Sequence, residues 1–244
     1  MLIVAYHAIG TPPSRIVTPL HWLRDDLCAL VDAGYRMVSL DACADWIAGR
    51  LILPPCSAVL TFDDGYASVL ASAVPVLQRM EIPATLFVVA GRIGSDNHWP
   101  GQPASVPRLP LVDTHMLSDL VAARVDIGSH TWSHPRLTSL DDAMLDDEVV
   151  GAADRLEQVA GVAVRHFAYP YGLYGPREVS HARLRFRTAL TTIPRLVGSA
   201  SDPHTLGRID AHDLHVAARL RLLGSPAILA PYLAARRGLR ALVR

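Results

Sequence analysis

Two neighbouring carboxylates, Asp63 and Asp64, stand in the segment TFDDGY at 61–66. Adjacent side chains on an extended strand point to opposite faces, so both carboxylates can share one site only where the chain turns. Gly65 permits such a turn. Two ionised carboxylates also repel each other unless a cation lies beside one of them. The pair is therefore either a cation site beside a free base or, as the plainer alternative, a solvated turn or helix N-cap.

Two histidines, His130 and His134, stand in the segment SHTWSH at 129–134. Side chains four residues apart face the same way on a helical turn, and this spacing is found in metal sites that use two histidines. A pair of surface histidines is the alternative. Pro135 follows directly and favours a loop or a terminating turn, where site residues tend to lie.

A third segment, FAYPYG at 167–172, combines turn residues with aromatic side chains. Pro170 and Gly172 predict a tight turn whose backbone N–H groups could face a developing oxyanion. Tyr169 and Tyr171 are candidates for the wall of a site, although tyrosines more often simply pack.

Together, these segments are more specific than any one of them. One carboxylate and two imidazoles form a facial metal site with open positions for water and a carbonyl oxygen. The second carboxylate is left to act as a base. This combination predicts a metal-assisted hydrolase.

Composition excludes several other kinds of chemistry. The chain has 244 residues, half of them apolar, and all 23 basic side chains are arginine. The lack of lysine excludes Schiff-base catalysis and the lysine of a phosphate-binding loop. The 23 acidic residues balance the arginines, so the whole chain has no electrostatic drive toward nucleic acid. Three cysteines without paired spacing make a disulfide framework improbable.

The hydrophobic pattern alternates between short apolar strands and amphipathic helices. This order predicts a parallel sheet, and polar residues at successive strand ends predict a barrel-like site. A Gly/Pro-rich loop over 91–110, which carries Trp99, is expected at the rim of that site, where it shapes substrate choice. The expected strands are 2–6, 35–40, 58–62, 84–90, 125–127, 164–168 and 188–192, and the expected helices are 20–33, 41–48 (with an acidic N-cap), 67–80, 140–160 and 177–185.

The two ends of the chain carry their own expectations. The start, MLIVAYHAIG, lacks a basic leader, and no stretch is long enough to span a membrane, so we expect a soluble, cytoplasmic protein. A chain trimmed of its leader would look the same. Residues 214–244 form an arginine-rich helical extension that we expect to pack on the domain formed by 1–213. A solvated closing helix interrupted by prolines is favoured there over contact with a membrane surface. The arginines of this stretch are Arg219, Arg221, Arg236, Arg237, Arg240 and Arg244.

In that order, TFDDGY, HTWSH and FAYPYG resemble the signature segments of the polysaccharide deacetylases, the NodB-homology proteins of carbohydrate esterase family 4. The surrounding text is also similar: LTFDDGY is followed by PVLQRMEIPATLFVV, then by IGSHTWSHPRLTSL and by LGRID at 206–210. The resemblance runs from about residue 3 to residue 210.

The resemblance implies a distorted (β/α) barrel that removes N- or O-acetyl groups from a carbohydrate by attack of a metal-bound water. One divalent ion is implied, usually zinc, with cobalt, nickel or iron(II) as alternatives. Asp64, His130 and His134 resemble the metal ligands and Asp63 the general base, whereas Pro170 and Tyr171 resemble the wall of the substrate groove. Tyr169 and Trp99 are further candidates for substrate contact.

Two departures from the family pattern affect other roles. Many members carry an arginine two residues before the Pro-Tyr pair, where this chain has Ala168. Many also carry a late Leu-x-His segment whose histidine protonates the leaving amine, and here the late histidines His212 and His215 stand in a different context. Members with an N-terminal Tyr-His pair resemble a permuted arrangement, which makes His7 the candidate general acid; a buried histidine capping the strand is the alternative.

Two other functions compete with deacetylation. One is removal of a formyl or acetyl group from a lipid-linked amino sugar. The other is a non-catalytic carbohydrate-binding module, which the presence of all four ligand and base residues disfavours.

Overall fold

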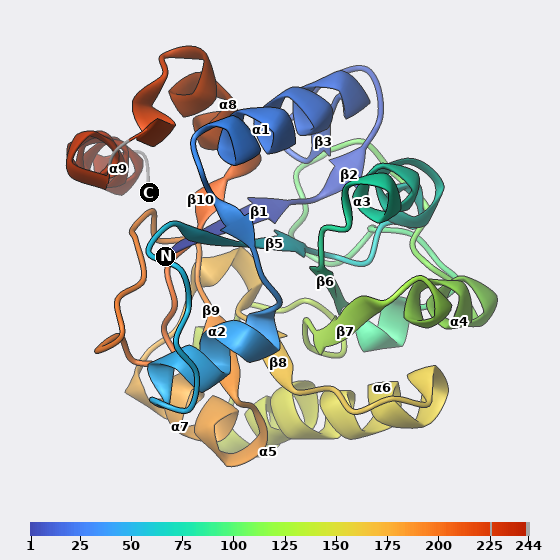
Figure 1. Cartoon of the computed structure of the whole chain (residues 1–244). Coiled ribbons are helices and arrows are strands. Elements are labelled where there is room, and N and C mark those ends of the chain that lie inside the picture. The colour runs from blue at the N-terminus through green and yellow to red at the C-terminus, as the bar shows by residue number, and fades with distance from the viewer. Residues whose placement is uncertain (225, 243–244) are drawn as a thin grey trace.

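A curled parallel sheet with helices packed around its outside forms the centre of the molecule (Figure 1). The computed structural model describes residues 1–224 and 226–242. Strands follow the order β10-β1-β5-β6-β7-β8-β9, and β4 pairs with β5 beside this path. Every pairing is parallel, as in the predicted distorted (β/α) barrel. The strands are β1 (Leu2–Tyr6), β4 (Arg36–Met37), β5 (Ser57–Phe62), β6 (Ala84–Val88), β7 (Val125–Ser129), β8 (His166–Ala168), β9 (Thr188–Leu190) and β10 (Ile209–Asp210), with a small separate sheet of β2 (Ala8–Ile9) and β3 (Val17–Thr18).

Helices connect the strands as the alternating pattern predicted. They are α1 (Leu20–Asp32), α2 (Leu40–Ile47), α3 (Val74–Met80), α4 (Thr114–Ala122), α5 (Asp142–Asp146), α6 (Ala152–Ala160), α7 (Pro176–Arg185), α8 (Ala211–Arg219) and α9 (Pro226–Leu242). Helix α4 was not among the expected elements. Conversely, the predicted strands over 35–40, 164–168 and 188–192 are shorter than expected, since only part of each run pairs with a neighbour.

Two predicted helices contain π-helical turns. The helix expected over 140–160 is divided into α5, a π-helical turn at Asp147–Gly151, and α6. The helix expected over 67–80 likewise begins with a π-helical turn at Val69–Ala73. A π turn inserts one residue into the helical repeat, and such insertions often occur at functional sites. The hydrophobic pattern predicts that a helix exists but does not detect this insertion.

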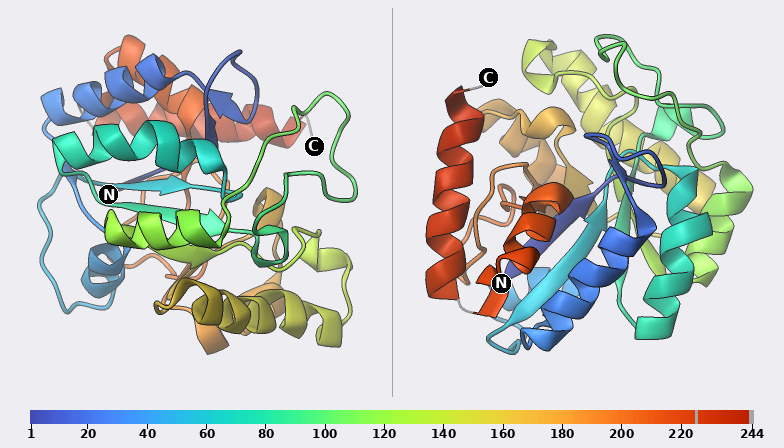
Figure 2. Two further views of the ribbon diagram at one scale, coloured as in Figure 1. Left: turned by 90° about the vertical axis from the view of Figure 1, so that its right-hand side faces the viewer. Right: turned by 90° about the horizontal axis from the view of Figure 1, so that it is seen from above.

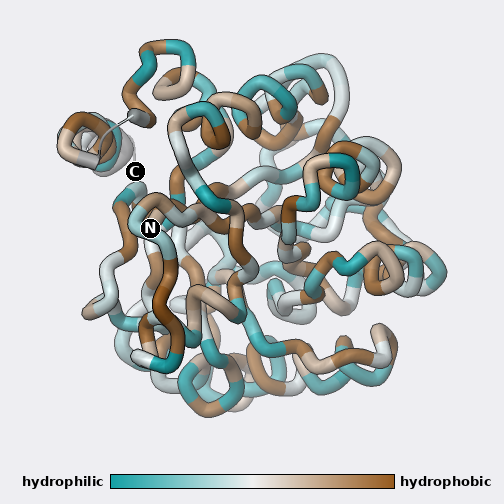
Figure 3. Tube along the Cα trace, viewed as in Figure 1, coloured by the Kyte–Doolittle hydropathy of each residue, from teal (hydrophilic) through white to brown (hydrophobic). Residues whose placement is uncertain are grey.

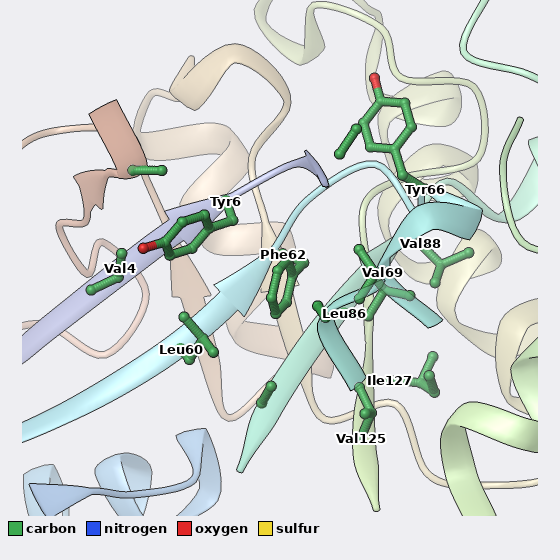
Figure 4. Close-up of a cluster of buried hydrophobic side chains, with 14 of the residues drawn as sticks. Val4, Tyr6, Leu60, Phe62, Tyr66, Val69, Leu86, Val88, Val125 and Ile127 are labelled. Carbon is green, nitrogen blue, oxygen red and sulfur yellow. The ribbon is translucent and has the colours of Figure 1, made fainter. Parts of the chain in front are cut away.

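Strand side chains alternate between two apolar layers. Leu2, Val4 and Tyr6 of β1 belong to the larger cluster, which packs under the helices, whereas Ile3 belongs to a smaller cluster inside the curled sheet. Figure 4 shows part of the larger cluster, with Leu60 and Phe62 of β5 beside β1. In Figure 3 the hydrophobic stretches, coloured brown, run along the strands at the centre. Each large side chain buried here contributes about 1.5–3 kcal/mol.

Helix α2 lies against the inside of the sheet, near the amino-terminal ends of the strands. Its Leu40 and Cys43 join the inner cluster. The predicted acidic N-cap is wrong: Ser39 caps the helix, its Oγ accepting from the Ala42 N–H at 3.1 Å. Asp41 lies in the first turn, where its carboxylate pairs with Arg165 and Arg187, each at 2.6 Å. Long-range ion pairs thus determine the environment of Asp41.

The C-terminal helices extend the outer layer. The expected boundary between the domain of residues 1–213 and the extension of residues 214–244 falls inside α8. One helix therefore belongs to both stretches. Helix α9 runs through Pro231 without interruption, contrary to expectation, and buries Leu229 and Leu233. Its Arg236 pairs with the buried Asp213 of α8. Figure 2 shows α9 in red along one side of the molecule.

Not every arginine of the C-terminal stretch is described. The side chain of Arg240, and Arg244 as a whole, lie outside the described residues. Over the described part of the chain, no helix combines the length and apolar character needed to cross a membrane.

Candidate metal centre and active site

The two carboxylates follow β5 directly and are separated by a sharp turn. Asp64 and Gly65 both adopt left-handed backbone conformations, with φ of +70° and +81°. A non-glycine residue rarely adopts this conformation, so the turn at Asp64 stores strain that the surrounding packing must offset. Asp63 and Asp64 are 3% and 5% exposed. The predicted turn is therefore present, and it brings both carboxylates into one buried site.

His130 and His134 follow β7 on a loop. Thr131 and His134 have φ of +72° and +62°, and the Thr131 hydroxyl accepts from the His134 N–H at 2.9 Å. The two imidazoles thus come together through a loop with two left-handed residues and not through a helical turn. This is the loop that Pro135 favoured.

Glu148 holds this loop from outside, and sequence analysis did not identify it. Its Oε2 accepts from the backbone N–H groups of Trp132 and Ser133, each at 2.9 Å, and its Oε1 accepts from the Ser133 hydroxyl at 2.5 Å. Glu148 lies in the π-helical turn at Asp147–Gly151. All three bonds end on the residues between the two histidines, so Glu148 fixes the path of the histidine loop.

Asp64, His130 and His134 bring three ligand atoms together. The Oδ1 of Asp64 lies 3.3 Å from Nε2 of His130 and 3.4 Å from Nε2 of His134. Among the described residues, these three form the group whose ligand atoms all lie within 4.8 Å of one another. One carboxylate oxygen with two imidazole nitrogens is a donor set used for zinc and other divalent transition metals.

The hydrogen bonds around the imidazoles also fit a metal. Nδ1 of His130 lies 2.7 Å from the Ala168 carbonyl oxygen, which can only accept, so Nδ1 carries the proton and Nε2 presents a lone pair. Burial lowers the pKa of His134, which favours the neutral form that binds metals. Burial alone would raise the pKa of the Asp64 carboxyl, but the two imidazoles hold it well below its ordinary range. Burial alone would lower the pKa of His130, but the neighbouring Asp64 and Asp63 carboxylates raise it, so a divalent cation bound here would displace a proton from that imidazole.

The second carboxylate is held by an arginine from the far end of the chain. Nη1 and Nη2 of Arg208 each lie 2.7 Å from an oxygen of Asp63. Arg208 is 1% exposed, and its Nε donates to the Thr191 carbonyl at 3.0 Å. Burial would raise the pKa of Asp63, but the guanidinium holds it below its ordinary value. A buried carboxylate kept ionised in this way can accept a proton.

The positive charge beside Asp63 comes from Arg208 and not from position 168, which is alanine. It belongs to LGRID at 206–210 and reaches the site because β10 pairs with β1, beside β5. The sequence shows that position 168 is not arginine, but sequence analysis did not identify Arg208 as a residue of the site. The one signal that could have identified it is that Arg208 is the basic residue of LGRID, a segment already similar to the family.

His7 follows β1, whose last residue, Tyr6, pairs with Phe62 and accepts from the Asp63 N–H at 2.9 Å, so the ends of the two strands place His7 on the side of the sheet edge that carries Asp63. The preceding Tyr6 anchors the strand: its hydroxyl donates to Asp26 Oδ2 at 2.9 Å. His215, one of the late histidines, contacts the other oxygen of Asp26 at 2.8 Å. The structure therefore places His7 at the strand end next to Asp63, whereas His215 is held by the buried Asp26.

Aromatic side chains form one wall of the site. Trp99 stacks on His134 with ring centroids 4.2 Å apart, and Tyr171 meets the same imidazole edge-on at 4.6 Å. Trp99 is carried by the predicted rim loop between β6 and α4, which Figure 2 shows in green, projecting from the sheet. Pro170 is buried behind Tyr171, as is Tyr169, whose hydroxyl donates to the His204 carbonyl at 3.0 Å. Tyr169 is therefore a packed side chain, which is the alternative to a place in the wall of the site.

Comparison with known proteins identifies the family. Residues 53–184, more than half of the chain, match the sequence profile of the family described as polysaccharide deacetylase. The chain belongs to the polysaccharide deacetylase family. The matched stretch contains both carboxylates, both histidines and the FAYPYG segment, so the family's signature segments are the ones that the fold brings together.

Individual relatives agree with this family assignment. The chain is 30% identical over 120 residues to a chitooligosaccharide deacetylase of Bradyrhizobium sp. (strain ANU 289), a match that covers 48% of this chain and 47% of that protein. It is 31% identical over 121 residues to poly-beta-1,6-N-acetyl-D-glucosamine N-deacetylase of Escherichia coli (strain K12), covering 46% and 17%. The chain thus spans half or less of the length of these two relatives. The solved structure of IcaB from Ammonifex degensii matches with a TM-score of 0.77 at 25% identity, covering 90% of this chain and 96% of that one.

Proposed function

We propose that this protein is a metal-dependent hydrolase that removes acetyl groups from an amino-sugar glycan. The observation that carries the proposal is a buried carboxylate, Asp63, ion-paired to Arg208 and adjacent to the three donors of the metal site. Relatives named as deacetylases of chitooligosaccharide and of poly-beta-1,6-N-acetyl-D-glucosamine support an N-acetylated substrate. Zinc is the expected ion, because one carboxylate and two imidazoles suit it well.

Asp64, His130 and His134 would hold the ion. When bound, a divalent ion supplies a Lewis acid that acidifies water and polarises the acetyl carbonyl. Asp63 then accepts a proton from the attacking water, because Arg208 keeps its carboxylate ionised.

Two further residues would act on the leaving group and on the oxyanion. His7 donates a proton to the departing nitrogen, and Tyr6 holds the strand end that carries it. The backbone N–H of Tyr171 helps to hold the oxyanion, and the Trp99 ring beside it excludes water from the wall.

Two substitutions at the adjacent carboxylates separate base from ligand. Asp63→Asn should retain bound zinc but lose at least about 100-fold in turnover, since general-base catalysis contributes that much. Asp64→Ala should lose the zinc as well. Acetate release from N-acetylglucosamine oligomers and metal content by mass spectrometry are the two measurements. Near-normal turnover in Asp63→Asn would reject its role as the base. Release of formate from an N-formylated amino sugar, without release of acetate from these oligomers, would indicate a deformylase.

The role of His7 needs a separate test. His7→Ala should lower turnover by about 100-fold while leaving metal content within twofold of the native protein. His212→Ala is the matched control, because this histidine lies on α8 and bonds the Ser14 carbonyl at 3.0 Å. Equal loss of metal and of turnover in His7→Ala would make His7 a ligand or a structural residue.

A further inference from the structure

A cavity separate from the candidate metal site lies on the outer side of the barrel, between α1 and α8. Its volume is about 400 Å³, within the range of small-molecule sites. Figure 1 shows the two helices side by side above β1 and β10. Its lining includes His21, Trp22 and Asp25 from α1, and His215 and Arg219 from α8. None of these residues has a part in the proposed reaction.

The floor of this cavity is a rigid polar assembly. Asp26 is fully buried, and its two oxygens are bonded to His215 Nδ1 at 2.8 Å and to the Tyr6 hydroxyl at 2.9 Å. Trp22 stacks on the His215 ring with centroids 4.3 Å apart and planes 9° from parallel. His215 is 8% exposed, and its Nε2 lies on the ring edge opposite the bonded Nδ1. A buried imidazole, fixed on one edge, thus offers a polar atom on the side away from Asp26.

The rim of the cavity carries opposite charges that do not neutralise each other. Asp25 on α1 and Arg219 on α8 are exposed and line the same cavity. Within residues 1–224 and 226–242, neither forms an ion pair. Both are therefore available to a ligand, one as an acceptor and the other as a donor.

This combination suits a sugar. The aromatic surface of Trp22 complements the apolar face of a pyranose ring, and the carboxylate, guanidinium and imidazole complement its hydroxyl groups. A balanced pair of charges favours a neutral polyhydroxy ligand over an anion such as a phosphate.

The position of the cavity suits a glycan that is already engaged at the metal centre. Helix α8 begins directly after β10, and β10 pairs with β1, whose end carries His7. Helix α1 begins just after β3, on the segment that follows His7. Asp26, which lines the cavity, accepts from the hydroxyl of Tyr6, the last residue of β1, so the cavity lies behind the carboxyl end of the strand that precedes His7.

We propose that the α1–α8 cavity is a secondary subsite that binds a sugar unit of the glycan chain away from the acetyl group being removed. This proposal rests on the proposed function for the identity of its ligand. Its consequence is a preference for long substrates, since only a long chain reaches both sites.

Comparison of a dimer with a hexamer of N-acetylglucosamine tests this subsite. Trp22→Ala, Asp25→Asn and Arg219→Gln should each raise KM for the hexamer, by about tenfold for Trp22→Ala, and leave kcat and KM for the dimer unchanged. Asp25→Asn and Arg219→Gln alter exposed side chains and should fold normally even if Trp22→Ala does not. Val216→Ala is the matched control, because Val216 is exposed on α8 but does not line the cavity.

Calorimetric titration of the hexamer into the same variants, each also carrying Asp63→Asn to stop hydrolysis, measures binding without turnover. Weaker hexamer binding in Arg219→Gln and Asp25→Asn than in Val216→Ala would support the subsite. Hexamer KM and affinity unchanged in all three variants would overturn it, as would an equal rise in KM for dimer and hexamer. If no acetate were released but the hexamer bound and the variants weakened that binding, the proposed function would fail and the subsite would stand.

Discussion

Removal of the Glu148 carboxylate should weaken metal binding although Glu148 is not a ligand. The carboxylate accepts three hydrogen bonds from Trp132 and Ser133, which lie between His130 and His134 in the candidate metal site. The same loop includes Thr131 and His134, both in the left-handed region. In Glu148→Ala the loop loses the contacts that hold it in this conformation.

The size of the effect can be estimated from these contacts. Hydrogen bonds to a charged group are worth about 1.5–3 kcal/mol each, and partial exposure of Glu148 together with non-additivity reduces their sum to roughly 3 kcal/mol. Left-handed residues cost on the order of 1–3 kcal/mol each, so the loop is expected to relax when Glu148 is removed. If most of that energy is needed to preorganise the ligands, metal affinity should fall by about 100-fold, the upper end of the range seen for residues that orient ligands.

Zinc competition against a chromophoric chelator measures this affinity directly, without turnover. Glu148→Gln retains one acceptor oxygen and should recover part of the loss. Asp146→Ala is the matched control, because Asp146 is an exposed acid two residues earlier. Zinc affinity in Glu148→Ala equal to that of Asp146→Ala would refute the argument that this carboxylate positions the ligands.

Three further predictions concern the ion pairs and the aromatic wall. Arg208→Met should lower the free energy of unfolding, measured by urea denaturation, by about 3–5 kcal/mol, because it leaves Asp63 buried without its partner. A smaller loss for Arg208→Met in an Asp63→Asn background would confirm that the two side chains are coupled. The pKa of Asp41 lies below its ordinary 3.8 in the folded state, chiefly because of the His166 imidazole, whose Nε2 lies 3.2 Å from Oδ1 of Asp41, so its stabilisation is present above pH 4 and is lost as the pH falls further. Asp41→Asn should therefore cost about 1–2 kcal/mol at pH 6 and clearly less, though not zero, at pH 2.5, and a constant difference across that range would contradict the ion-pair explanation. Trp99→Ala should raise KM for the glycan by about tenfold, because it removes part of the wall, and an unchanged KM in steady-state assays would place the substrate elsewhere.

The amino-acid sequence by itself determined the fold class and the three residues of the candidate metal site. Each of the three polar segments directly follows an apolar strand, and parallel strands place their carboxyl ends at one edge of the sheet. Asp64, His130 and His134 were therefore predictable without coordinates. Gly65 also predicted the turn that lets the two adjacent carboxylates share one site. These features are local, since they depend on residue type and on short spacing along the chain.

Only the tertiary structure decided what surrounds those residues. Arg208 lies 145 residues from Asp63 in sequence, and the two meet because β10 adds to the sheet next to β1. Glu148 reaches the histidine loop because a π-helical turn directs it there. Tyr6 is tied through Asp26 to His215, 189 residues beyond that aspartate. The physical reason is the same in each case: a buried charge needs a partner, and which distant residue can supply it depends on strand order and helix packing, which no local spacing encodes.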